Sequence, residues 1–79
     1  MKVNKSEQKV LDQLHIGTES ETVRNPFSGE SVELEPTAVA VYDYLIGAER
    51  MGHPDVPTFN RMRMFFRKNW GHAYMVLLD

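Results

Sequence analysis

The stretch RNPFSGESVEL, residues 24–34, predicts a reversal of the chain between two short extended segments. Pro26 fixes φ near the value that a turn needs, and Gly29 readily adopts a positive φ. The side chain of Asn25 is suited to bond the backbone just downstream, which helps to start a turn. We therefore expect a β-hairpin over residues 21–35.

The flanks of this turn have the pattern of strands. Apolar and polar residues alternate in residues 22–24 and again in residues 31–34, which is the period of a strand with one buried face. Val23, Val32 and Leu34 would share that face. Because a two-stranded ribbon is marginal in water, it must rest on other apolar elements.

A first helix is predicted over residues 4–16. Asn4 is a good N-cap, and Glu7 three residues later completes a capping-box pattern. The apolar stripe is narrow, so we expect loose packing, and Gly17 is expected to end the helix.

The strongest helical pattern covers residues 36–51. Pro36 is tolerated in the first turn, and Gly52 suits a helix end. One sector of this amphipathic helix carries its main apolar residues, namely Ala38, Val41, Tyr42, Leu45 and Ile46.

A third helix is predicted over residues 58–70, after a stiff linker HPDVP at residues 53–57. Thr58 would cap it, and Gly71 would end it. Its buried face is expected to consist of large apolar residues, namely Phe59, Met62, Phe65, Phe66 and Trp70.

The last segment, residues 72–78, is compatible with a helix or with a third strand, and we favour a helix. Taken together, the pattern predicts a single small α+β domain over residues 1–79, with three helices, or four if the last segment is helical, and one β-hairpin. This class agrees with 79 residues that are 42% hydrophobic and 25% charged.

The composition limits the classes of function that we expect for this protein. Without cysteine the chain has no disulfides and no thiolate chemistry. It also has no apolar run long enough to cross a bilayer and no signal-peptide pattern, so we expect a cytoplasmic location.

Patterns for catalysis, metal and cofactor binding are weak. His15, His53 and His72 lie in three separate segments, without the spacing of metal ligands. The acidic cluster in residues 30–35 belongs to the hairpin, where charges keep an exposed face wet. Since the serines are not placed with a base, we expect no enzyme, no cofactor and no metal.

The stretch RMRMFFRKNW, residues 61–70, has the character of an interaction site. The helical wheel places its aromatic residues inward and leaves Met64 on the opposite face. Methionine and arginine are both enriched at protein interfaces. We therefore predict a protein-interaction patch consisting of Asn60, Arg61, Met64, Arg67 and Lys68.

Three segments of the chain resemble small uncharacterised proteins of tailed bacteriophages. These segments are NPFSGESVELEP, AVAVYDYLIGAE and FFRKNWGHAYMVLLD, and the likeness covers roughly residues 25–79. The shared motifs are an N-P-x-[ST]-G turn, a helix like A-V-A-x-Y-D, and a C-terminal F-x-K-N…AY-x-x-LLD. The resemblance implies no activity and no site residue, but it implies the cytoplasm of an infected bacterium as the setting.

We therefore expect a small non-enzymatic interaction module, such as a phage accessory protein that binds and modulates a host protein. A first alternative is a nucleic-acid-binding module that uses Arg61, Arg63, Arg67 and Lys68, although the net charge of −2 is unlike that of most such modules. A second alternative is a structural or virion protein that self-associates through the hairpin edge or the C-terminal apolar run.

Overall fold

The computed structural model describes residues 2–52 and 55–78, and in this part of the chain it shows four helices and one antiparallel hairpin. The α+β class is confirmed. The elements in chain order are α1 (Lys5–Leu11), β1 (Glu21–Arg24), β2 (Ser31–Leu34), α2 (Pro36–Met51), α3 (Val56–Asn69) and α4 (Gly71–Leu77).

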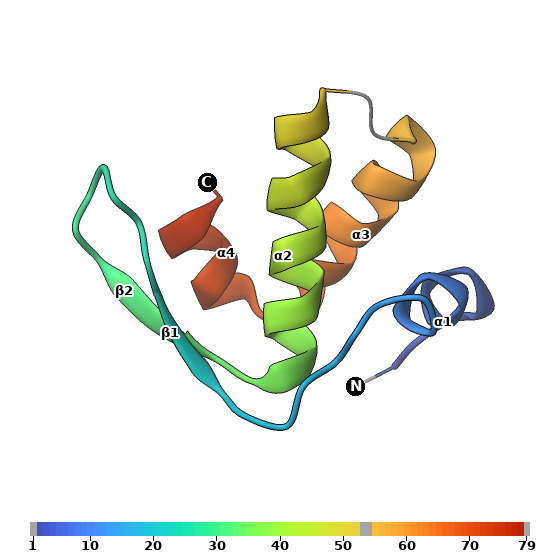
Figure 1. The fold of residues 1–79 in the computed structure, drawn as a ribbon, viewed down its shortest axis with the longest axis horizontal. Helices are drawn as coiled ribbons and strands as arrows, with labels where there is room; N and C mark the ends of the chain where they lie inside the picture. The colour runs from blue at the N-terminus through green and yellow to red at the C-terminus, as the bar shows by residue number, and fades with distance from the viewer. Residues whose placement is uncertain (1, 53–54, 79) are drawn as a thin grey trace.

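Helix α2 is the central element of the fold (Figure 1). The hairpin curves round one side of α2 and α1 lies at the opposite side. Strand β2 contacts both α4 and α2, while α3 contacts α1, α2 and α4. The hairpin therefore rests on helices, as an isolated ribbon must.

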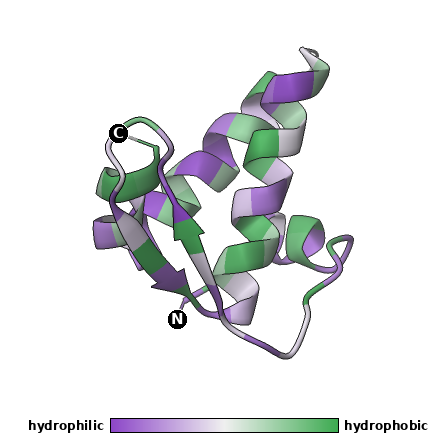
Figure 2. Ribbon diagram, turned by 60° about the vertical axis from the view of Figure 1, so that its left-hand side comes forward, coloured by the Kyte–Doolittle hydropathy of each residue, from purple (hydrophilic) through white to green (hydrophobic). Residues whose placement is uncertain are grey.

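The two strands pair in the register that the alternating pattern predicts. Val23 lies opposite Val32, and Glu21 lies opposite Leu34. Leu34 is almost completely buried, whereas Glu33 is exposed. Figure 2 shows this change of hydropathy along both strands.

Asn25 organises the turn and ties it to the C-terminal helix. Its side-chain oxygen accepts a hydrogen bond from the Phe27 N–H at 2.8 Å, and its backbone oxygen accepts one from the Gly29 N–H at 2.9 Å. Gly29 has φ 79°, a value that strains other residues. The Asn25 Nδ2 donates to the backbone oxygen of Val76 at 2.8 Å, which holds the hairpin against α4.

The core lies where α2, α3 and α4 meet β2. The ring of Trp70 packs edge-on against Phe65, at 5.7 Å between centroids, and its centroid lies 5.5 Å from that of Phe66. The buried core residues are Leu11, Leu34, Ala38, Val41, Leu45, Met62, Phe65, Phe66, Ala73 and Tyr74.

Helix α2 has the predicted bounds. Pro36 occupies its first turn, and Gly52 ends it in the left-handed conformation with φ 72°. Ala40 is also buried, although the helical wheel had not placed it in the main apolar sector.

Helix α1 is shorter than the predicted span of residues 4–16. The capping box is present, since Asn4 and Glu7 exchange backbone-to-side-chain hydrogen bonds of 2.8 and 3.0 Å. The helix ends at Leu11, and the chain then turns through i to i−3 hydrogen bonds. Of the residues between Leu11 and Gly17, only Leu14 packs against the core, and the others are exposed, with Ile16 39% exposed, so little packing supports further helical turns.

Helix α3 begins earlier than the predicted residue 58. Asp55 is the N-cap, and its carboxylate accepts hydrogen bonds from the backbone N–H and the hydroxyl of Thr58 at 3.5 and 3.0 Å. Val56 and Pro57 therefore belong to the first turn and not to a linker, a position where proline is tolerated. The other linker positions, 53 and 54, lie outside the described residues.

The ambiguous last segment is helical. Helix α4 runs from Gly71 to Leu77, so Gly71 begins a helix and does not itself break the previous one. The break lies at Trp70, whose φ of −135° and ψ of 58° are not helical. Val76 is buried, whereas Leu77 and Leu78 are half-buried.

Candidate functional site

The predicted interaction patch forms one continuous face of α3. On a helix, residues three and four apart are neighbours, so the positions around residue 64 are 60, 61, 67 and 68. Asn60, Arg61, Arg67 and Lys68 occupy these four positions and are all exposed. Met64, at their centre, is 49% exposed. We call these five residues the α3 patch.

The opposite side of α3 is the core. Met62, Phe65 and Phe66 have at most 1% of their surface exposed. Phe59 and Trp70 are half-buried and pack against the same cluster. The inward direction of the aromatic side chains and the outward direction of Met64 are thus confirmed, because a 14-residue helix with this spacing has a single apolar stripe.

Tyr74 of α4 lies beside the α3 patch and contacts two cationic side chains of α3, Arg63 and Arg67. The Arg63 Nη1 donates to the Tyr74 hydroxyl at 2.9 Å, and Arg63 is only half-exposed. The guanidinium carbon of Arg67 lies 5.7 Å from the centre of the Tyr74 ring, within the range of a cation–π contact. These contacts hold the cations in a defined position.

The patch continues onto α4, which the sequence alone did not indicate. A hollow of about 300 Å³ is lined by Arg67, Gly71, Tyr74 and Met75, so Arg67 borders both helices. Met75 is 66% exposed. Met75 can be assigned to the surface beside the α3 patch only if residues 72–78 are known to form a helix that follows a break at Trp70.

The charged residues of this region are all basic. Residues 56–78 contain four of the nine lysines and arginines of the chain and no aspartate or glutamate. The acidic residues of the described chain precede α3. The α3 patch therefore presents positive charge around an apolar centre, on a protein whose net charge is −2.

Two of the cations also stabilise the helix itself. Arg67 and Lys68 lie in the last turn of α3, where positive charge is favourable beside the free carbonyl groups. The Asn69 Nδ2 donates to the Phe65 carbonyl at 3.0 Å and adds a side-chain hydrogen bond to the last turns of the helix. Helix stability accounts for cations at this end, but it does not account for an exposed methionine.

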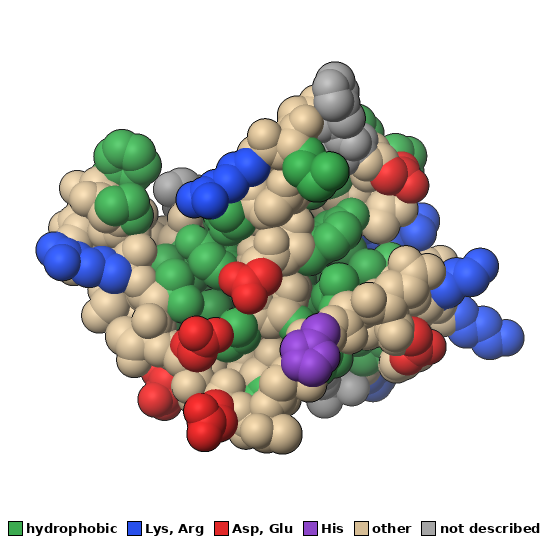
Figure 3. Space-filling view, in the orientation of Figure 1, with side chains coloured by type: hydrophobic (Ala, Val, Ile, Leu, Met, Phe, Trp, Pro, Cys, Tyr) green, Lys and Arg blue, Asp and Glu red, His purple; other side chains and the backbone are tan. Residues whose placement is uncertain are grey.

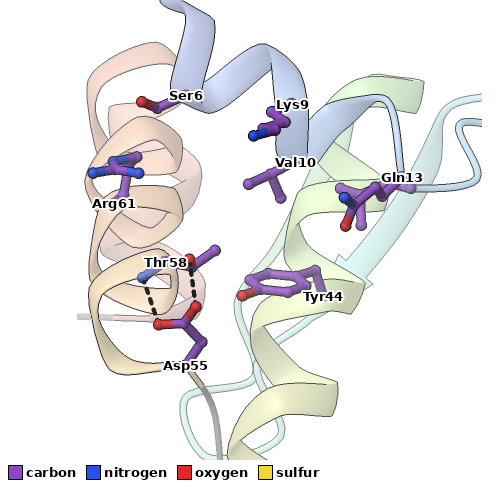
Figure 4. Close-up of a pocket in the computed structure, with 9 residues that line it drawn as sticks. Ser6, Lys9, Val10, Gln13, Tyr44, Asp55, Thr58 and Arg61 are labelled. Atoms are coloured by element: carbon purple, nitrogen blue, oxygen red, sulfur yellow. Dashed lines mark hydrogen bonds between the residues drawn. The ribbon is translucent and has the colours of Figure 1, made fainter.

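A second hollow, of about 670 Å³, lies between α1, α2 and α3 (Figure 4). Lys9 and Arg61 project from α1 and α3, and the hydroxyl of Tyr44 is directed from α2 toward Asp55 and Thr58. Burial, and to a smaller extent the negative charge of Asp55, raise the pKa of Tyr44 above its usual value. At neutral pH Tyr44 is therefore a neutral hydrogen-bond donor, while Asp55 is used to cap α3.

The histidines do not come together in the described structure. His15 is exposed in the connection between α1 and β1, His72 is exposed on α4, and His53 lies outside the described residues. Within residues 2–52 and 55–78, no group of three histidine, aspartate or glutamate side chains is placed to hold a metal ion. In the same residues, no helix has the length and the apolar character that a membrane crossing requires.

Comparison of the chain with protein-family models, with curated proteins and with solved structures gave no match.

Proposed function

We propose that this protein is a small non-enzymatic interaction module that binds an acidic surface of another protein through the α3 patch. The observation that carries the proposal is the exposure of Met64 at the centre of four exposed polar and cationic neighbours. An apolar centre with a charged rim is the usual anatomy of a protein interface.

The chemistry of the patch favours an acidic partner with an apolar centre. Met64 has a flexible, polarisable side chain that adapts to irregular surfaces. Arg61, Arg67 and Lys68 would pair with carboxylates, and Arg67 is already oriented by Tyr74, which reduces the entropy lost on binding. Met75 extends the apolar contact onto α4.

The proposed setting is the cytoplasm of a bacterium infected by a phage, with a host protein as the partner. This part of the proposal rests on the resemblance to small phage proteins over residues 25–79. Modulation of the host protein would then follow from occupying its acidic surface.

The test is affinity purification from bacterial lysate with the wild-type chain and with the double variant Met64→Asp, Arg67→Glu. We expect one host protein to be recovered in stoichiometric amount by the wild type and to be lost with the variant. Both positions are exposed, so the variant is expected to remain folded. Equal recovery by both chains would overturn the proposal.

A matched control is available at the end of α2. Met51 is 77% exposed, and Arg50 lies in the last turn of α2 as Arg67 lies in the last turn of α3. Met51→Asp with Arg50→Glu makes the same chemical change on another face. We expect this control to retain the partner.

Binding to nucleic acid has one supporting observation, the absence of acidic residues in residues 56–78. It has weaker geometric support, because Phe65 and Phe66 are buried and do not offer stacking surfaces, and Arg63 is held by Tyr74. Titration with DNA and RNA at low and high salt tests it, since affinity driven by phosphate contacts falls steeply with salt.

A further inference from the structure

Phe27 at the tip of the hairpin is 97% exposed. It stands beside a groove of about 620 Å³ between the hairpin, α2 and the end of α4. The apolar part of the groove consists of half-buried residues, namely Tyr42, Ile46, Leu77 and Leu78. Figure 3 shows hydrophobic side chains in the hollow between the hairpin and α2, with a cationic side chain on each side of it.

The backbone holds Phe27 in this exposed position. Its N–H donates to the Asn25 side chain, which is itself bonded to Val76 of α4. The Asn25 N–H donates to the Glu30 oxygen at 2.8 Å and closes the loop. An aromatic side chain on a fixed turn loses little conformational freedom when it is buried in a contact, and such anchors dominate binding energies.

We propose that the protein forms a two-fold homodimer in which Phe27 of each copy enters the groove of the other copy. A two-fold interface requires one patch that is complementary to itself. This patch meets the requirement because it carries both an exposed aromatic anchor and an apolar groove. The proposal uses a different face from the α3 patch and does not depend on the proposed function.

The charges at the rims fit the same arrangement. Arg24 borders the groove on the hairpin side, Glu49 and Arg50 border it on the α2 side, and all three are exposed. In a two-fold pair, the hairpin of one copy faces α2 of the other copy. Arg24 of each copy then pairs with Glu49 of its partner, while the adjacent Arg50 stays directed to solvent, which gives two complementary pairs.

Sedimentation equilibrium from about 10 μM to about 1 mM tests the proposal. We expect a reversible monomer–dimer equilibrium whose dissociation constant rises at least tenfold in Phe27→Ser. Because Phe27 makes almost no contact in the monomer, the variant is expected to keep its melting temperature. The control Met64→Ser, on the α3 patch, is expected to dimerise like the wild type.

A charge exchange distinguishes this interface from any other self-association. Arg24→Glu is expected to weaken the dimer, and Arg24→Glu combined with Glu49→Arg is expected to restore it. A chain that stays monomeric over the whole concentration range would overturn the proposal and leave the groove to a different protein. A Phe27→Ser variant that dimerises like the wild type, or a charge exchange without rescue, would also overturn it.

Discussion

Helices α1 and α4 each contain seven residues, but they are stabilised in opposite ways. Helix α1 has a complete capping box and buries one residue, Leu11. Helix α4 has no side-chain cap and buries Ala73, Tyr74 and Val76. Isolated helices of this length are marginal in water. The comparison shows that local signals define α1, whereas contacts with distant parts of the chain define α4.

The difference also bears on function. Helix α4 supplies Tyr74 and Met75 beside the α3 patch, so its position shapes the proposed interaction surface. Helix α1 supplies Lys9 to the hollow shown in Figure 4. It approaches the α3 patch only near Arg61, which lines the same hollow. Loss of α4 packing should therefore affect binding more than loss of α1 packing.

The largest expected effect in this comparison is that of Tyr74→Ala. It removes a 9%-exposed ring and the partner of Arg63, and it should lower the free energy of unfolding by about 3 kcal/mol. Tyr74→Phe keeps the ring and should cost about 1 kcal/mol. Urea denaturation measures both. Equal losses for the two variants would mean that the ring does not hold α4.

Leu11→Ala should have the next largest effect, about 2 kcal/mol in urea denaturation. Leu11 is 6% exposed, but the loosely attached α1 is expected to close over part of the cavity. Val3→Ala is a control at a half-buried position of the same segment and should cost less. A loss for Leu11→Ala greater than that for Tyr74→Ala would reverse the comparison.

Asn25→Ala tests the long-range tie between the hairpin and α4. It removes the bond to the Val76 carbonyl and the acceptor for the Phe27 N–H, and it should cost about 1–2 kcal/mol. Asn25→Asp keeps the acceptor and loses the donor, so it isolates the tie. Hydrogen exchange of α4 amides should accelerate in both variants, and unchanged exchange would contradict this role.

Asn4→Ala should have the smallest effect, about 0.5–1 kcal/mol. It removes the acceptor for the Glu7 N–H and so opens the capping box. Amide exchange should accelerate in α1 and stay unchanged in α4. Faster exchange in both helices would show that the two are coupled through α3.

Much of the fold follows from local chemistry. The bounds of α2 follow from Pro36 and Gly52, and the hairpin register follows from the alternation around Asn25 and Gly29. The outward face of α3 follows from helical periodicity, which is why the exposure of the α3 patch was predictable.

The start of α3, the helical state of α4 and the position of Met75 depend on alternatives between which the sequence alone does not decide. Asp55 and Thr58 are both good N-caps, and the structure uses Asp55, which moves the start of α3 to Val56. The state of α4 depends on its contacts with β2 and on the bond to Asn25, 51 positions earlier. Met75 could be placed beside Arg67 only after the turn at Trp70 was known.

The bond between Asn25 and Val76 has a consequence for biosynthesis. The hairpin is translated well before α4, so the nascent ribbon has no partner for the Asn25 amide while the ribosome is still adding the later helices. The hairpin can reach its final position against α4 only after Val76 has left the ribosome. Native packing of the hairpin is thus expected only after α4 has been translated, and a ribosome stalled before Gly71 would display a hairpin that is not yet packed against α4 and is open to chaperones and proteases.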